Sequence, residues 1–219
     1  MIKAVILDFD DTLCLTEEAC FSMENEALQS MGRPVMPREV HKANWGKPLF
    51  VAIQERSPGI DIDAFRQAYE PINIRYAAEG LLDKIPEENY EVMDELITMG
   101  KQLVVLTSRE HGELKHLLEP DHLLASRVAT FYYKDNMQFH KPDPRAFAHI
   151  EHEHGWKPEE CVYVGDSVSD AMAANGAGLR LIISLQSGLR DRGEFADYQV
   201  DKFIGMFPEI VSAVQSLDR

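Results

Sequence analysis

With 219 residues, the chain is long enough for one compact domain, or for a domain that carries a modest inserted one. A hydrophobic content of 45% excludes disorder as the dominant state, and a net charge of −15 disfavours nucleic acid and anionic membranes as partners. The three scattered cysteines argue against a disulfide framework or a structural zinc site. We expect a soluble, cytoplasmic protein, because no apolar stretch is long enough for a membrane span or a signal peptide.

Short and nearly continuous apolar runs predict strands that are buried on both faces. They cover Lys3 to Leu7, Gln102 to Leu106, Arg127 to Tyr133, Cys161 to Val164 and Leu181 to Ser184. The helical patterns that follow them cover Pro86 to Gly100, Pro144 to His154, Ser169 to Gly176 and Pro208 to Leu217. Strands that alternate with helices predict an α/β fold, a Rossmann-like parallel sheet covered by helices on both faces.

The stretch from Leu15 to Lys84 interrupts this alternation, because its patterns predict helices only. The predicted helices are Thr16 to Met31, Pro37 to Asn44, Pro48 to Glu55 and Ile62 to Tyr69. Pro71 is expected to end or kink the last helix, since proline removes a backbone N–H and clashes one turn back. We therefore predict an α/β core domain formed by residues 1–14 and 85–219, and a small helical domain formed by residues 15–84.

Polar side chains follow four of the predicted strands. They are Asp8 and Asp10 after the first strand, Thr107 and Ser108 after the second, Lys141 in the loop after the third, and Asp166 and Asp170 after the fourth. Each of them alone is also typical of turns and helix caps. Ligands of open α/β sheets bind beyond the carboxyl ends of the strands, so we expect these residues to share one site.

The same segments resemble the four motifs of haloacid dehalogenase superfamily phosphatases. DFDDTL at residues 8–13 resembles their DxDxT motif, VVLT at 104–107 their second motif, HKPDP at 140–144 their third and VGDSVSD at 164–170 their fourth. The spacings are typical of members with a helical cap after the first motif, the phosphoglycolate phosphatase and beta-phosphoglucomutase-like subfamily. The resemblance spans roughly residues 2–183, and it implies that residues 15–84 form the cap.

The resemblance implies a Mg²⁺-dependent phosphatase that hydrolyses a small phosphorylated metabolite, a phosphate monoester, through an aspartyl-phosphate intermediate. Asp8 would be the nucleophile, and a covalent intermediate divides a very slow reaction into two easier steps. Asp10 would protonate the leaving oxygen and later activate water. One carboxyl group must be ionised while its neighbour carries a proton, so the two environments must separate their pKa values.

Several carboxylates in one site repel each other, so a hard dication is expected, and Mg²⁺ prefers oxygen ligands. By the resemblance, its ligands would be the Asp8 carboxylate, the Asp10 backbone carbonyl and Asp166. Asp170 would orient bound water or Lys141 from behind these ligands. Lys141 supplies a fixed positive charge to the transferring phosphoryl group, and Thr107 and the Ser108 backbone are expected to bind the same oxygens.

Substrate selection is expected to involve Gly46 and Lys47, which lie where related enzymes present specificity residues from the cap. Lys47, and Arg109 just after the second motif, could reach a second anionic group of the substrate. The identity of the phosphorylated substrate stays open between phosphoglycolate, a sugar phosphate, a nucleotide and a phosphonate. The oligomeric state also stays open.

Two other functions remain as alternatives. A beta-phosphoglucomutase-like enzyme uses the same aspartate but returns the phosphoryl group to a sugar. A non-catalytic binding or regulatory module could use the same fold, although every expected catalytic position is filled here. A dehalogenase is disfavoured, because those relatives lack the second aspartate of the first motif, which is present as Asp10.

Overall fold

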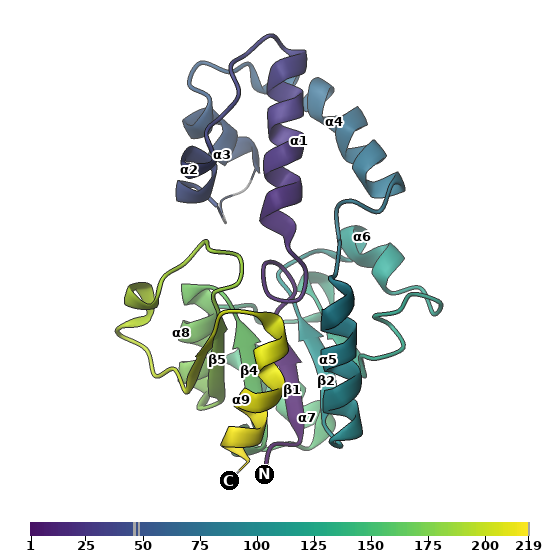
Figure 1. Ribbon diagram of the computed structural model, residues 1–219, viewed down its shortest axis with the longest axis vertical. Coiled ribbons are helices and arrows are strands. Elements are labelled where there is room, and N and C mark those ends of the chain that lie inside the picture. The colour runs from purple at the N-terminus through teal and green to yellow at the C-terminus, as the bar shows by residue number, and fades with distance from the viewer. Residues whose placement is uncertain (46, 48, 219) are drawn as a thin grey trace. The chain divides into compact units, whose positions relative to one another are not determined.

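The computed structural model describes residues 1–45, 47 and 49–218 (Figure 1). The chain forms two compact units, one made of Met1–Cys14 with Ile85–Arg219 and the other of Leu15–Lys84. We call them the α/β unit and the helical unit. Among the described residues, no helix combines the length and the apolar character that a membrane crossing requires.

The α/β unit contains a six-stranded sheet with the order β3-β2-β1-β4-β5-β6, in which all neighbouring strands are parallel. The strands are β1 (Ala4–Leu7), β2 (Gln102–Leu106), β3 (Thr130–Tyr132), β4 (Cys161–Gly165), β5 (Arg180–Ser184) and β6 (Lys202–Ile204). The predicted parallel α/β fold is therefore confirmed.

Two details of the strands differ from the prediction. The third strand begins at Thr130 rather than Arg127, because the backbone N–H groups of residues 127 and 128 both donate to the Leu124 carbonyl and close a turn. The edge strand β6 was not predicted, since three residues that begin with a lysine form too short an apolar run. Its backbone pairs with β5 all the same.

Helices cover both faces of the sheet, because alternate side chains of each strand enter two separate hydrophobic cores. Val5 and Leu7 pack in one core, and Ala4 and Ile6 pack in the other. The helices of the first core are α5 (Glu87–Thr98) and α9 (Ile210–Leu217), and those of the second are α7 (Arg145–His154) and α8 (Val168–Ala177) (Figure 1). The short helix α6 (His111–Leu114) follows β2.

The strand order reverses between β1 and β4, because the chain runs from β1 outward to β3 and then from β4 outward to β6. At such a switch point the connections leave in opposite directions, and the carboxyl ends of the two strands stay open for a ligand. Asp8 follows β1 directly, and Asp166 follows β4 directly. Both carboxylates therefore lie where ligands bind in sheets of this class.

The helical unit contains α1 (Thr16–Ser30), α2 (Arg38–Ala43), α3 (Leu49–Arg56) and α4 (Ile62–Ala78). The expectation that the last helix ends at Tyr69 is wrong, because α4 continues through Pro71. Pro71 is exposed, whereas the next residue, Ile72, packs in the same core as Phe65, two helical turns earlier. This burial offsets the backbone hydrogen bond that proline cannot donate.

A cluster of charged side chains is buried in the helical unit. His41 of α2 places Nδ1 2.7 Å from Oε1 of Glu17 and Nε2 3.1 Å from Oε1 of Glu24. Arg56 of α3 donates to both Glu24 oxygens, at 2.6 and 2.8 Å, and Arg38 donates to Glu17. The carboxylates of Glu17 and Glu24, two of the four glutamates of α1, are thus neutralised by partners on α2 and α3.

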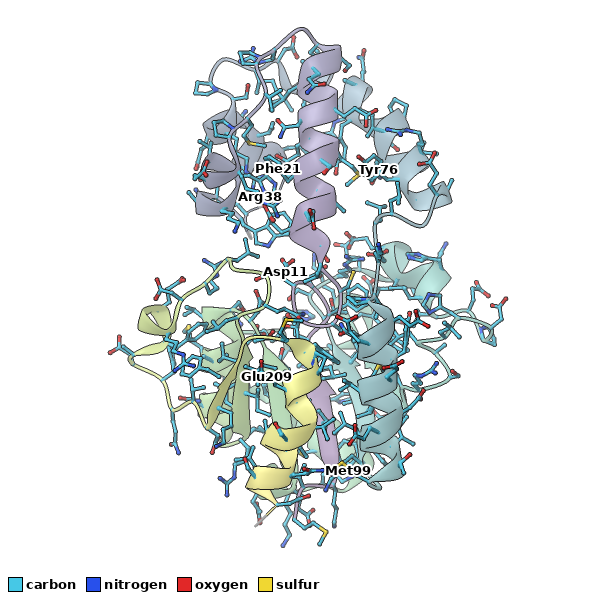
Figure 2. The ribbon with its side chains drawn as sticks, in the orientation of Figure 1. Asp11, Phe21, Arg38, Tyr76, Met99 and Glu209 are labelled. Carbon is cyan, nitrogen blue, oxygen red and sulfur yellow. The ribbon has the colours of Figure 1, made fainter. Side chains whose placement is uncertain are left out.

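His41 is surrounded in a way that favours its protonated form. Both ring nitrogens face carboxylate oxygens, which only accept hydrogen bonds, and a neutral imidazole has a single N–H to donate. Burial acts to lower the pKa of His41, but its hydrogen bonds to Glu17 and Glu24 outweigh burial and raise it. The rings of Trp45 and of Phe21, which is labelled in Figure 2, pack against the imidazole.

We expect the helical unit to lose stability as the pH rises. The pKa of histidine is ~6.5 in an unfolded chain, and that of His41 is higher in the folded cluster. The protonated His41 therefore stabilises the folded unit fully below about pH 6.5, and this stabilisation is lost as the pH rises past the pKa of the folded state. Each unit of pKa difference corresponds to about 1.4 kcal/mol. Urea denaturation between about pH 5 and pH 9, followed by Trp45 fluorescence in a Trp156→Phe background, measures this loss.

The control for this prediction is a histidine without buried partners. His41→Gln should remove the loss of stability with rising pH, because glutamine does not titrate. His152→Gln, at an exposed position, should leave that pH dependence of stability unchanged. Equal pH profiles for wild type and His41→Gln would contradict the assignment of the effect to His41.

Candidate active site

The loop that follows β1 presents Asp8 and Asp10 at the open edge of the sheet. Asp8 is buried, and its backbone N–H donates to the Val164 carbonyl at 2.8 Å, which ties this loop to β4. The turn is closed by the N–H groups of residues 13 and 14, which both donate to the Phe9 carbonyl. Asp11, labelled in Figure 2, has φ 57°, a left-handed conformation that aspartate adopts more readily than most residues.

Lys141 connects the first and fourth motifs. Its Nζ donates to Oδ1 of Asp8 at 2.7 Å, to Oδ1 of Asp170 at 2.8 Å and to the hydroxyl of Tyr163 at 2.9 Å. An ammonium group has three hydrogens, so all of them are used. The lysine side chain is only 5% exposed, and these contacts therefore hold a buried positive charge between two carboxylates.

Asp170 is held in place by the start of α8. Its Oδ2 accepts hydrogen bonds from the Ser167 hydroxyl at 2.7 Å and from the backbone N–H groups of Ser167 and Asp166 at 2.9 and 3.2 Å. Gly165 makes this approach possible, because a Cβ at that position would lie 2.6 Å from Cγ of Asp170. Gly165 of the fourth motif thus allows the Asp170 side chain to pack directly against the backbone.

Three buried carboxylates around one lysine leave a surplus of negative charge. Burial and the nearby Asp170 raise the pKa of Asp8 to about 7, although Lys141 acts to lower it. The pKa of Asp166 lies well above its usual value because of burial and the charges of Asp170 and Asp8. Burial has the same effect on Asp170, but Lys141 and the other donors hold its pKa below the usual value. Asp8 and Asp166 therefore need a further positive charge to be ionised together.

The donor set fits a hard divalent cation. Carboxylate oxygens of Asp8, Asp166 and Asp170 lie within 4.8 Å of one another, and oxygen donors of this kind suit Mg²⁺. Both oxygens of Asp170 already accept hydrogen bonds, whereas no donor within the described part of the chain contacts the Asp166 carboxylate. Asp8 and Asp166 are thus best suited to hold the cation, and the Asp10 backbone carbonyl belongs to the same loop as Asp8.

Thr107 and Ser108 follow β2, which pairs with β1 on the side opposite to β4. Thr107 is buried, its N–H donates to the Tyr132 carbonyl at 2.9 Å, and its hydroxyl oxygen accepts from the Arg109 N–H at 3.2 Å. That hydroxyl keeps its own hydrogen for a further acceptor. Ser108 is exposed.

Arg109 contacts Asp10 directly. Its Nη2 lies 2.6 Å from Oδ1 of Asp10, and its Nε lies 3.1 Å from each of the two carboxylate oxygens. The guanidinium carbon lies 4.7 Å from the centre of the Phe9 ring. A predicted specificity residue and the predicted acid–base residue are therefore paired with each other.

The two remaining predicted residues belong to the helical unit. The ammonium of Lys47 donates to Glu55 at 2.6 Å and to the side chain of Asn44 at 3.2 Å, and it is exposed. Gly46 lies outside the described residues. All other predicted site residues belong to the α/β unit.

Tyr163 of β4 was not named from the sequence. It is fully buried, and its hydroxyl donates to Oδ1 of Asp170 at 2.7 Å while it accepts from Lys141. Its ring packs edge-to-face against Phe147, with ring centres 4.9 Å apart. A tyrosine within an otherwise apolar strand was the available signal, because a buried tyrosine hydroxyl usually has a hydrogen-bond partner.

Residues 5–184 match the family model of haloacid dehalogenase-like hydrolases. The chain belongs to this family. The resemblance seen in the four motifs is thereby confirmed, and so is the expectation that the protein is a hydrolase. The matched region of this haloacid dehalogenase-like hydrolase includes every predicted site residue, from Asp8 to Asp170.

Known relatives of this haloacid dehalogenase-like hydrolase include phosphatases. It is 24% identical over 220 residues to a phosphoglycolate phosphatase of Nitrosospira multiformis, covering 98% of this chain and 96% of that enzyme. It is 26% identical over 205 residues to a phosphorylated carbohydrates phosphatase of Thermotoga maritima, covering 87% and 88% of the two chains. The crystal structure of CbbY from Rhodobacter sphaeroides in complex with phosphate shares the fold, with a TM-score of 0.71 and 23% identity over 98% of this chain and 100% of that one.

Proposed function

We propose that this protein is a Mg²⁺-dependent phosphatase that hydrolyses a small phosphorylated metabolite through an aspartyl-phosphate intermediate on Asp8. One observation carries the proposal: the buried Asp8 carboxylate lies at the switch point of the sheet, 2.7 Å from Nζ of Lys141 and beside Asp166. A carboxylate in this position can attack a phosphoryl group whose charge the surrounding residues neutralise. The activities of the relatives support the substrate class.

In the first step, an oxygen of Asp8 attacks phosphorus, and the bond between phosphorus and the ester oxygen breaks. Asp10 donates a proton to the departing oxygen, so the product leaves as an alcohol. The Thr107 hydroxyl, the Ser108 N–H and Lys141 stabilise the phosphoryl oxygens. All three hydrogens of Lys141 already donate to protein atoms, so Lys141 can bind a phosphoryl oxygen only by giving up one of these hydrogen bonds. We propose that it gives up the one to Asp8, because Asp8 itself becomes bonded to the phosphoryl group.

In the second step, a water molecule attacks the phosphorus of the aspartyl phosphate, and Asp10 accepts a proton from it. The bond between phosphorus and the Asp8 oxygen breaks, which releases inorganic phosphate and restores the carboxylate. Asp10 has then recovered the proton that it gave away in the first step. The two steps therefore balance, and the protein returns to its starting state.

The residues that we propose for Mg²⁺ are the Asp8 carboxylate, the Asp10 backbone carbonyl and Asp166. When bound, Mg²⁺ would supply the positive charge that these carboxylates and the phosphoryl oxygens require. Asp170 would hold Lys141 in place through the contact described above. We further propose that the protein is cytoplasmic and that the helical unit is a cap, which contributes Lys47 and Gly46 to substrate selection.

Phosphate release from a panel of phosphorylated metabolites, with an aryl phosphate as a generic substrate, tests this proposal. We expect turnover with Mg²⁺, loss of turnover with excess EDTA, and recovery when Mg²⁺ is added back. Circular dichroism with EDTA checks that the fold is retained. Turnover that EDTA leaves intact would contradict the metal requirement, and silence across the panel by folded protein would contradict the phosphatase assignment.

Tyr163→Phe is expected to lower kcat about tenfold and to leave KM nearly unchanged. The variant removes the acceptor of one Lys141 hydrogen and a donor to Asp170, so the lysine is less well oriented during phosphoryl transfer. Steady-state kinetics on the best panel substrate checks this, with Tyr198→Phe in the same core as the control. An unchanged kcat would show that the Tyr163 hydroxyl has no part in orienting Lys141.

A further inference from the structure

The buried charged cluster of the helical unit contacts the backbone just before Lys47. We call Asn44, Trp45 and Lys47 the Lys47 segment. Nη2 of Arg56 donates to the Asn44 carbonyl at 2.9 Å, and Nη1 of the same guanidinium donates to both oxygens of Glu24, at 2.6 and 2.8 Å. The side chains of Arg56 and Glu24 are only 1% and 2% exposed. An ion pair in the interior of the unit therefore reaches the first residue of the Lys47 segment.

The rest of the Lys47 segment contacts the same elements. The Trp45 ring packs against the imidazole of His41, with ring centres 5.1 Å apart. The Lys47 ammonium donates at 2.6 Å to Glu55 of α3. The segment is thus held at its first residue by a buried guanidinium and at its last residue by an exposed ion pair.

A guanidinium is suited to this double contact. Its nitrogens lie in one rigid plane, so one of them can face a carboxylate while another faces a carbonyl. The ammonium of a lysine is a compact point charge, and a single nitrogen cannot occupy both positions. Apolar residues of similar volume often stabilise a buried site as well as an ion pair does, so stability alone does not call for an arginine here.

We propose that Arg56 is a positioning residue for substrate selection, because its contact with the Asn44 carbonyl fixes the Lys47 segment. The inference rests on the proposed function, in which Lys47 takes part in selection. Arg56 acts through the backbone of the segment and not on the substrate. Loss of its contact should therefore weaken the binding of the part of the substrate that does not react, which raises KM and leaves kcat nearly unchanged.

Arg56→Lys tests this role with two substrates, the metabolite that ranks first in the panel and 4-nitrophenyl phosphate. We expect KM for the metabolite to rise about tenfold, with kcat changed by less than about twofold. The aryl phosphate carries no second anionic group for Lys47, so its KM should stay nearly the same. Lys47→Ala should give the same pattern. Arg56→Lys combined with Lys47→Ala should cost no more than Lys47→Ala alone, because both changes act through one segment.

The fluorescence of Trp45 reports on the Lys47 segment without any substrate. In a Trp156→Phe background, Trp45 is the only tryptophan of the chain. Quenching by acrylamide should become more efficient in Arg56→Lys, because the segment is held less firmly. The control is Arg75→Gln, which removes an exposed pair with Glu26 between α4 and α1. It should change neither the quenching nor the KM values.

A second variant covers a failure of Arg56→Lys to fold. Glu24→Gln combined with Arg56→Met removes both charges of the pair, so no unpaired carboxylate stays buried at position 24. The glutamine oxygen can still accept from His41, whereas the Asn44 carbonyl loses its donor. We expect the same rise in KM and the same gain in quenching. Denaturation curves check that each variant is folded.

The outcomes are distinct. A rise in KM confined to the metabolite, no further loss in the combined Arg56 and Lys47 variant, and stronger quenching of Trp45 support the inference. Equal losses for both substrates, additive losses with Lys47→Ala, or unchanged quenching would overturn it. If Lys47→Ala itself leaves KM unchanged, Arg56 cannot act through Lys47, and the inference fails while the phosphatase assignment stands. If the wild type hydrolyses no phosphate monoester, the proposed function fails, and the role in selection fails with it.

Discussion

Asp8→Asn is expected to lower phosphatase turnover by at least about 10⁴-fold, because the amide is not a nucleophile and no covalent intermediate can form. The variant should nevertheless fold. Asparagine has nearly the same shape, its oxygen can still accept from Lys141, and one negative charge leaves a cluster in which burial and Asp170 already raise the pKa of Asp8. Phosphate release, measured beside a thermal melting curve, checks both expectations.

The control for this variant is an aspartate in an ordinary surface pair. Asp94 of α5 is exposed and bonded to Arg127, so Asp94→Asn should change turnover by less than about twofold. Rapid quenching with a ³²P-labelled substrate should trap label on the wild type, and hydroxylamine should remove it, as expected for an acyl phosphate. Labelling of Asp8→Asn to the same extent, or turnover near that of wild type, would contradict the assignment of Asp8 as nucleophile.

Lys141→Met is expected to reduce kcat by about 10²- to 10³-fold and to destabilise the α/β unit by about 3–5 kcal/mol near neutral pH. The lysine is the shared partner of Asp8 and Asp170, and removing it leaves buried carboxylates without compensation. The pKa of Asp8, which burial already raises, then rises further, and the pKa of Asp170 is no longer lowered by Lys141, so the folded protein binds more protons than the unfolded chain. The loss of stability should therefore grow as the pH rises from about 5 to about 8.

Urea denaturation at both ends of this pH range measures the effect, and a second substitution identifies its origin. Asp8→Asn combined with Lys141→Met should recover part of the stability, because one uncompensated charge is removed. Lys134→Met removes an exposed lysine that is paired with Glu110, and it should leave the stability nearly unchanged at both pH values. A pH-independent loss in Lys141→Met would instead indicate that the lysine contributes through packing alone.

The parallel sheet and its family could be predicted from the sequence, because both depend on local patterns. Each of the runs that form β1 and β4 is apolar over its whole length, as a strand covered on both faces requires, and each is stopped by an aspartate. Parallel strands end at the same edge, so Asp8 and Asp166 had to lie near each other once the strands were known. The four motifs carry the same information in a form that identifies the family.

Weak or conflicting local signals were decided by packing. Proline predicts a helix end at Pro71, yet α4 continues because Ile72 and Phe65 are buried in one core, and that burial outweighs one missing hydrogen bond. The three residues of β6 have no strand pattern of their own, and they form a strand because β5 offers a paired edge.

By itself, the sequence determined the fold class, the family and the strand ends at which polar residues gather, since hydrophobic periodicity and motif spacing are properties of neighbouring residues. Only the tertiary structure decided which charged and polar groups are partners. Arg109 meets Asp10 across 99 positions of the chain, and His41 meets Glu17 across 24. Such pairs form where elements that are distant in sequence pack together, so local sequence patterns cannot predict them. They depend on the folded core as a whole.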